Sequence, residues 1–300
     1  MIDNKYPKKQ SGVALIQVLL ISAIITVMAL RLSYNARNQV GISATFEERA
    51  QAQLKLSSAQ ANVMFTLLTQ SHQNTEGRNT AQNAHEVTPQ WNYYGKPFNL
   101  EPDVTVKIND HRGLIPQRLP SSTLWEDFLT REEVNEQQQK LMLARLNDWQ
   151  YQKRVTESDA SSALKTTEKG IAYPFRSIQL PQEVSFIFPN ELHQQLQELT
   201  SHYAHYTFNP LNAPDPILLT FFDPALAQLI IDQRENNALD VDMVKAAVGN
   251  DFAEESISFA TGQYLRVVFN VRYKQVMLKE TIELKIEQYT NSPLLLLSRY

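Results

Sequence analysis

The sequence predicts an α+β protein with one long N-terminal helix, a small antiparallel sheet and a group of helices. Three observations support this class. Residues 13–70 combine an apolar run with good helix formers, residues 104–108 and 265–286 alternate between apolar and polar side chains, and the chain between these two regions has helical periodicity. Because the alternating regions flank the helical one, we expect the helices to be an insertion into a single sheet-containing domain.

The first element is an apolar segment without a charge, the 18 residues from Val13 to Leu30. A membrane-spanning helix needs about 20 mainly apolar residues and at least about 17. We therefore predict that 13–30 crosses a bilayer. Lys5, Lys8 and Lys9 precede it, so the positive-inside rule puts residues 1–12 in the cytoplasm and the bulk of the chain outside.

The helix is expected to continue into solvent as far as residue 70. Residues 34–68 are rich in Ala, Gln, Leu, Arg and Glu, most of which favour helices. One set of apolar side chains falls roughly on one face of this extension: Leu54, Ala61, Met64, Phe65 and Leu68. We predict that this face packs onto the domain.

The N-terminus resembles the class III signal of type IV pilins and type II secretion pseudopilins. A basic leader, residues 1–12, ends in Gly12, and Val13-Ala14-Leu15-Ile16-Gln17 opens the apolar helix. The resemblance implies that a prepilin peptidase cuts between Gly12 and Val13 and methylates the new N-terminus. A glycine before the cut leaves the peptide bond accessible. A plain signal anchor, with Gly12 there by chance, is the simpler alternative.

Gln17 departs from the family pattern, in which the fifth mature residue is usually Glu. That Glu is thought to pair with the N-terminal amine of a neighbouring subunit, and an amide carries no charge to do so. The large minor pseudopilin K characteristically lacks it. The chain therefore resembles the minor pseudopilin K family (general secretion pathway protein K), which implies a pilin-like fold and a place at the filament tip.

After the long helix, Val104, Val106 and Ile108 alternate with polar residues and predict a strand that ends at the turn 110–113. A capping box at Thr130 and Glu133 predicts a helix reaching Trp149. Further helix starts are predicted from capping residues and Asp-Pro pairs at Asn190, Asp215-Pro216, Asp223-Pro224 and Asp240. Apolar residues of the Asn190 helix extend to Tyr203. The expected domains are 71–109 with 256–300, and the inserted helical 110–255.

Residues 208–213 and 218–234 also resemble pseudopilin K, in its Asn-rich run and its helix-hairpin-helix-like segment. Such hairpins elsewhere bind nucleic-acid backbone through glycine-exposed N–H groups. Here Phe222-Asp223-Pro224 supplies a negative charge and removes a donor. The net charge of −4 likewise gives no basic surface, so we expect no nucleic-acid partner.

The C-terminal region predicts a β-hairpin. Residues 265–273 and 276–286 alternate with period two on either side of Lys274-Gln275, and Leu294 to Leu297 after Pro293 is expected to add an edge strand.

Little in the sequence indicates catalysis. The chain has no Cys, which excludes thiolate chemistry and Cys-based zinc sites, and no catalytic or phosphate-binding motif is present. His202 and His205 could face a metal, but we favour a solvated helix face. Calcium sites occur in the resembled family, and the acidic candidates here are Asp240, Asp242, Asp251, Glu254 and Glu255. Helix caps and solvated charge are the simpler interpretation.

The resemblance implies a minor pseudopilin at the tip of the periplasmic pseudopilus of a type II secretion system. It also implies four kinds of partner: other minor pseudopilins, prepilin peptidase, the inner-membrane secretion platform and inner-membrane lipid. Alternatives are a minor pilin of a type IV pilus or DNA-uptake machine, a single-span periplasmic binding module and, more remotely, an anchored hydrolase. The hydrolase would need a catalytic pair converging in a cleft.

Overall fold

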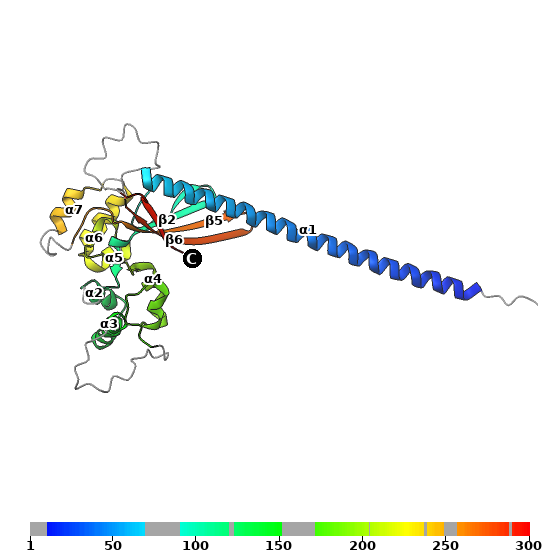
Figure 1. Cartoon of the computed structure of the whole chain (residues 1–300), viewed down its shortest axis with the longest axis horizontal. Coiled ribbons are helices and arrows are strands. Elements are labelled where there is room, and N and C mark those ends of the chain that lie inside the picture. The colour runs from blue at the N-terminus through cyan, green and yellow to red at the C-terminus, as the bar shows by residue number, and fades with distance from the viewer. Residues whose placement is uncertain are drawn as a thin grey trace, which may run out of the picture.

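The computed structural model describes residues 11–69, 91–119, 123–151, 172–203, 205–236, 239–248, 257–287 and 290–300. Helix α1 (Ser11–Thr69) projects from an assembly of strands and short helices (Figure 1). Its 59 residues extend about 90 Å at about 1.5 Å per residue. The predicted continuous helix is confirmed.

Among the residues that the structure describes, only the C-terminal part of α1 packs onto the rest of the chain. Its buried residues recur every three or four positions, at Ala52, Leu56, Ala59, Val63 and Leu67. All of them except Ala52 belong to one hydrophobic core that α1 forms with the sheet.

The predicted packing face of α1 was wrong. Leu54 is 64% exposed, Phe65 is 67% exposed and Leu68 is 43% exposed. Ala61 is exposed as well, and Met64 is partly buried at the margin of the core. Because α1 carries apolar side chains on two faces, its own periodicity does not show which face meets the sheet.

In the part of the chain that the structure describes, the sheet has five antiparallel strands in the order β1-β2-β5-β6-β7. The strands are β1 (Phe98–Glu101), β2 (Val104–Asp110), β5 (Tyr264–Tyr273), β6 (Val276–Ile286) and β7 (Leu294–Arg299). The predicted hairpin is confirmed, with Lys274 in the turn at φ 51°. Val106, Val267 and Ile282 are among the alternating residues that point toward α1.

Between β2 and β5 the described residues form six helices with their own hydrophobic core. They are α2 (Thr123–Arg131), α3 (Glu136–Gln150), α4 (His193–Leu199), α5 (Asp215–Phe221), α6 (Pro224–Glu235) and α7 (Val241–Val248). Short 3-10 turns connect them: η2 (His111–Gly113), η3 (Pro181–Phe186), η4 (Asn190–Leu192) and η5 (Pro210–Asn212). This part also contains a parallel pair, β3 (Ile115–Pro116) with β4 (Thr200–Ser201), so it is not purely helical.

The cap predictions met different outcomes. Asp223 caps α6, since its Oδ1 accepts from the Ala225 N–H at 2.8 Å, and Asp240 caps α7 in the same way. The capping box at Thr130 was wrong, because Thr130 lies in α2 and α3 is capped by Asn135, which accepts from the Gln138 N–H at 2.9 Å. The helix predicted to reach Tyr203 ends at Leu199.

Candidate assembly surfaces and the buried junction

The charge-free start of α1 is the first candidate surface. Gly12 lies within α1, and Val13 is 62% exposed. Gln17 is exposed too. This end of α1 is long and apolar enough to cross a membrane, and none of its most apolar 18-residue window is buried against the protein. Apolar side chains so fully exposed need a nonpolar environment to cover them.

The second surface is the face of α1 opposite the sheet, which we call the outer stripe: Leu54, Ala61, Phe65 and Leu68. Leu54, Ala61 and Leu68 are spaced by seven residues, the repeat that brings side chains to one seam of a helix pair. Because the stripe is exposed in the single chain, it is suited to receive a second helix.

The sheet and the helical part meet at a buried polar cluster centred on Glu283 of β6. Glu283 accepts from His111 Nε2 at 2.6 Å, from Arg266 Nε at 2.9 Å and from the Tyr300 hydroxyl at 3.1 Å. Burial alone would raise the pKa of Glu283, but His111 and Arg266 outweigh it and lower the pKa to about 2. The carboxylate is therefore an acceptor only, and His111 Nε2 must carry a proton.

His111 also reaches Ser201 of β4, with 2.8 Å between Nδ1 and Oγ. Ser201, His111 and Glu283 thus form a Ser-His-acid chain of hydrogen bonds, but with the two ring nitrogens exchanged relative to serine hydrolases, in which Ser bonds to Nε2 and the acid to Nδ1. All three are enclosed, however, with Ser201 and Glu283 0% exposed and His111 1% exposed. A substrate carbonyl has no access to this Oγ, so the chain acts as a structural link between β6, η2 and β4.

Arg266 extends this link to α4. Its guanidinium donates to the carbonyls of Gln197 at 2.8 Å and Thr200 at 3.3 Å. These carbonyls are at the C-terminal end of α4, where unpaired carbonyls favour a cation. Arg266 therefore donates hydrogen bonds both to Glu283 of the sheet and to the C-terminal carbonyls of α4 in the helical part.

His202 and His205 lie beside this cluster and differ from the prediction. They follow β4 rather than sitting on a helix, and they are buried, at 6% and 8% exposed. Burial lowers the pKa of each to about 4. Both are thus neutral at pH 7. Their prediction as a solvated face failed because tertiary contacts cover this segment: the His202 ring lies 6.1 Å from that of His111, and Tyr203 stacks on Tyr264 of β5 at 4.7 Å.

A second junction joins the same two parts at Asp110, where β2 ends. Asp110 Oδ2 accepts from Asn212 Nδ2 at 2.8 Å and from the Gly262 N–H at 2.9 Å. At Gly113, any Cβ would overlap the Asn212 carbonyl oxygen. This close contact requires glycine and holds η2 against η5.

Arg234 of α6 is another buried charge that the sequence did not single out. It is 6% exposed and donates to the Ala213 carbonyl at 2.8 Å and to the carbonyl of Pro210. Its guanidinium lies over the ring of Tyr94, 4.6 Å from the centroid. Burial lowers the pKa of Arg234 to about 10. The side chain ties α6 to η5 and to the segment before β1.

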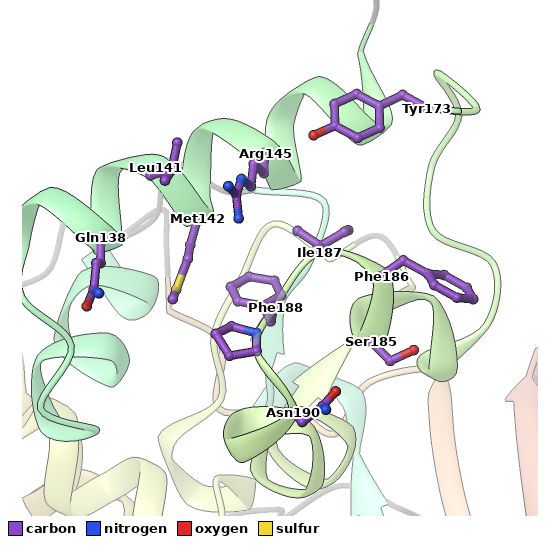
Figure 2. A pocket seen from close by; sticks show the side chains of 11 residues that line it. Gln138, Leu141, Met142, Arg145, Tyr173, Ser185, Phe186, Ile187, Phe188 and Asn190 are labelled. Carbon is purple, nitrogen blue, oxygen red and sulfur yellow. The ribbon is translucent and has the colours of Figure 1, made fainter. Parts of the chain in front are cut away.

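A cavity of about 350 Å³ opens between α3 and the turns η3 and η4 (Figure 2). Met142, Ile187 and Phe188 form a buried apolar floor, while Leu141 and Phe186 are partly exposed at its rim. Its size is at the lower limit for ligand pockets. The described lining residues include Ser185 but no His, Asp or Glu to act as its base, so the cavity does not revive the hydrolase alternative.

The acidic calcium candidates are only partly described. Asp240 caps α7, and Asp242 is an exposed residue that pairs with Lys245 at 3.3 Å. Asp251, Glu254 and Glu255 lie outside the described residues. Within the described ranges no three His, Asp or Glu side chains are grouped so as to hold a metal ion.

Comparison with solved structures identifies the fold. A chain of the crystal structure of the GspK-GspI-GspJ complex from the enterotoxigenic Escherichia coli type 2 secretion system matches with a TM-score of 0.54 and 14% identity. The match covers 86% of this chain and 98% of that chain. No protein-family sequence model and no curated protein sequence matches. This chain therefore has the α+β fold of a chain found in a type II secretion complex.

Proposed function

We propose that this protein is a K-type minor pseudopilin of a type II secretion system. The observation that carries the proposal is the combination of a charge-free, unburied helix start with a domain that shares its fold with a chain of the GspK-GspI-GspJ complex. Its role is structural: the protein anchors in the inner membrane through 13–30 and presents its bulk in the periplasm. The enclosed Ser201 and the structural nature of the matched complex both support a protein that works by packing rather than by catalysis.

Maturation begins at the N-terminus. Prepilin peptidase cuts between Gly12 and Val13 on the cytoplasmic side and methylates Val13. Membrane lipid covers the apolar start of α1, and the secretion platform in the inner membrane extracts the mature helix during assembly. The exposed, unpacked state of this segment supports the step, because no tertiary contact has to be broken.

Other minor pseudopilins are the proposed partners. The outer stripe gives their helices a place to pack alongside α1, where a seven-residue spacing suits parallel helices that start in the same membrane. Gln17 lacks the charge that a shaft subunit uses toward its neighbour, and the helical part adds bulk above the sheet. Both features favour the tip of the pseudopilus, where the protein caps the filament and helps initiate its assembly.

N-terminal sequencing and intact mass of the membrane-extracted protein test this proposal. In cells with prepilin peptidase, we expect a chain that starts at methylated Val13, and in cells without the enzyme, one that starts at Met1. Gly12→Val should block processing. Gly41→Val is the matched control, because a Cβ at Gly41 meets nothing within 4 Å. A chain that keeps residues 1–12 in both strains would refute the proposal and favour a single-span periplasmic binding module.

A minor pilin of a type IV pilus or DNA-uptake machine would be processed in the same way. Association separates the two: a K-type pseudopilin co-purifies with the other minor pseudopilins of a type II system. Gln17→Glu provides a further distinction. It should leave processing unchanged but let the protein enter the filament shaft more often than the wild type does.

A further inference from the structure

The half of the sheet nearest the β5–β6 turn carries different charges on its two faces. On the α1 side, Asp103 pairs with Lys55 at 2.6 Å, and Glu280 accepts from Gln60. The opposite face carries Lys107, Arg272 and Lys279 together with Met277, which is 76% exposed. We call these four residues the hairpin face.

The register shows that these side chains share one side of the sheet. Arg272 lies opposite Met277, and Asn270 lies opposite Lys279 and Thr105. Because side chains alternate along a strand, Lys107, two positions after Thr105 on β2, lies on the same side of the sheet as Thr105. The residues of 104–107, 268–273 and 276–281 that point this way include no Asp or Glu. The three cations form no ion pair with another described residue, although the chain as a whole has a net charge of −4.

In the same half of the sheet, the described part of the chain places no strand beside the first residues of β6. Thr281 exchanges both backbone hydrogen bonds with Tyr300, at 2.8 and 3.0 Å, and β6 begins five residues before Thr281, at Val276. Because hydrogen-bonding direction alternates along an antiparallel strand, Lys279 and Met277 point their N–H and C=O groups the same way as Thr281. No described strand lies beside them. Unpaired edges of this kind accept an additional strand.

We propose that the hairpin face and this edge dock an extended, acidic segment of a partner minor pseudopilin. The segment adds as a strand beside 277–279, with an apolar side chain next to Met277 and carboxylates that face Lys279 and, one strand further across the same face, Arg272. This inference rests on the proposed function, since it takes the partner to be anchored in the same membrane. Charge complementarity selects the chemistry of the partner, because three cations on one face, none of them paired with a described acidic residue, would repel a basic strand and attract an acidic one.

Anionic lipid is the other polyanion near such a protein, and the geometry disfavours it. The hairpin turn lies beside Glu48, which pairs with Lys274 at 3.4 Å. Glu48 is 17 residues beyond Arg31, which is about 25 Å along the helix. That is roughly three times the Debye length of about 8 Å at physiological salt, so headgroup charges are screened at the hairpin face.

Photo-crosslinking in the full-length chain tests the proposal. A photo-reactive amino acid replaces Met277, and the chain is co-expressed with the other minor pseudopilins of its secretion system. We expect an adduct with one of these partners, mapped to a segment that carries Asp or Glu. The same label at exposed Leu141, on α3, is the control and should give no adduct with that segment.

Charge reversal supplies the second readout. Arg272→Glu with Lys279→Glu should weaken binding of the detergent-solubilised partner at least about tenfold at 0.15 M salt. Lys140→Glu with Lys245→Glu reverses as many charges on α3 and α7 and should leave binding unchanged. Circular dichroism melting identifies any loss of folding, which exposed substitutions are not expected to cause.

If the complex forms and its affinity does not change with Arg272→Glu and Lys279→Glu, this inference is overturned and the proposed function stands. The same holds if the complex forms but the label at 277 gives no adduct. An adduct with lipid rather than protein would overturn it in favour of a membrane contact. Failure of the wild-type chain to bind any co-expressed minor pseudopilin would overturn both.

Discussion

Glu283→Gln tests whether the buried cluster holds the sheet to the helical part. The substitution keeps the size of the side chain but removes the charge that faces Arg266, which is 5% exposed, and His111. Removing one partner of a buried pair leaves the other charge uncompensated and costs about 3–5 kcal/mol. For domains of about 150–250 residues this corresponds to roughly 2–4 °C per kcal/mol, so we expect Tm to fall by about 6–20 °C.

The assay is thermal unfolding of the detergent-solubilised chain, followed by near-ultraviolet circular dichroism. Trp125 and Trp149 report on the helical part, since both are buried in its core. Glu136→Gln is the matched control. Its partner is Lys140, and both side chains of that pair are at least 75% exposed, so Tm should stay unchanged. A fall in Tm for Glu283→Gln no larger than that of Glu136→Gln would refute the assignment of the cluster as the link.

Further predictions follow from the burial or exposure of single side chains. The pKa of His202 and of His205 is about 4 in the folded state, below the unfolded value of 6.5. The free energy of unfolding therefore has its full value above pH 6.5 and decreases as the pH falls toward 4. The loss should approach roughly 3 kcal/mol for each His by pH 4, and a histidine double variant, His202→Gln with His205→Gln, should show a flatter profile in urea unfolding between pH 6.5 and 4. Leu67→Ala should cost about 2–5 kcal/mol because Leu67 is fully buried. Phe65→Ala on the outer stripe should leave Tm unchanged and instead weaken co-purification with partner pseudopilins; the reverse pattern would show that the faces of α1 are misassigned. Gly113→Ala should destabilise by more than about 1 kcal/mol in the same unfolding assay, because its Cβ overlaps the Asn212 carbonyl, whereas Gly41→Ala, in open space, should be neutral or stabilising.

Local patterns predicted the elements well where a single neighbour determines the structure. The alternation at 265–286 around Lys274-Gln275 predicted the hairpin, since each strand of a hairpin pairs with the strand beside it in sequence. Asp223 and Asp240 were identified as caps because a cap bonds to N–H groups only two or three residues away. The charge-free run from Val13 likewise needs no tertiary contact to be recognised.

Local patterns gave the wrong prediction where the nearby sequence fits two helix boundaries, or two packing faces, equally well. Thr130 and Glu133 satisfy the pattern of a capping box, yet α2 already occupies Thr130 because Trp125 and Phe128 are buried in the helical core. Similarly, α1 offers Leu54, Phe65 and Leu68 on one face and Leu56, Val63 and Leu67 on another. Hydrophobicity alone ranks the two faces about equally.

What the sequence determined by itself is therefore the α+β class, the hairpin, the caps Asp223 and Asp240 and the charge-free run from Val13, all set by interactions within a few residues or by the length of an apolar run. What only the tertiary structure decided is the packing face of α1 and the buried cluster. His111 lies 90 residues from Ser201 and 172 from Glu283. No local pattern marks such a triplet, because its members are chosen by the space and charge at the place where the sheet and the helices meet.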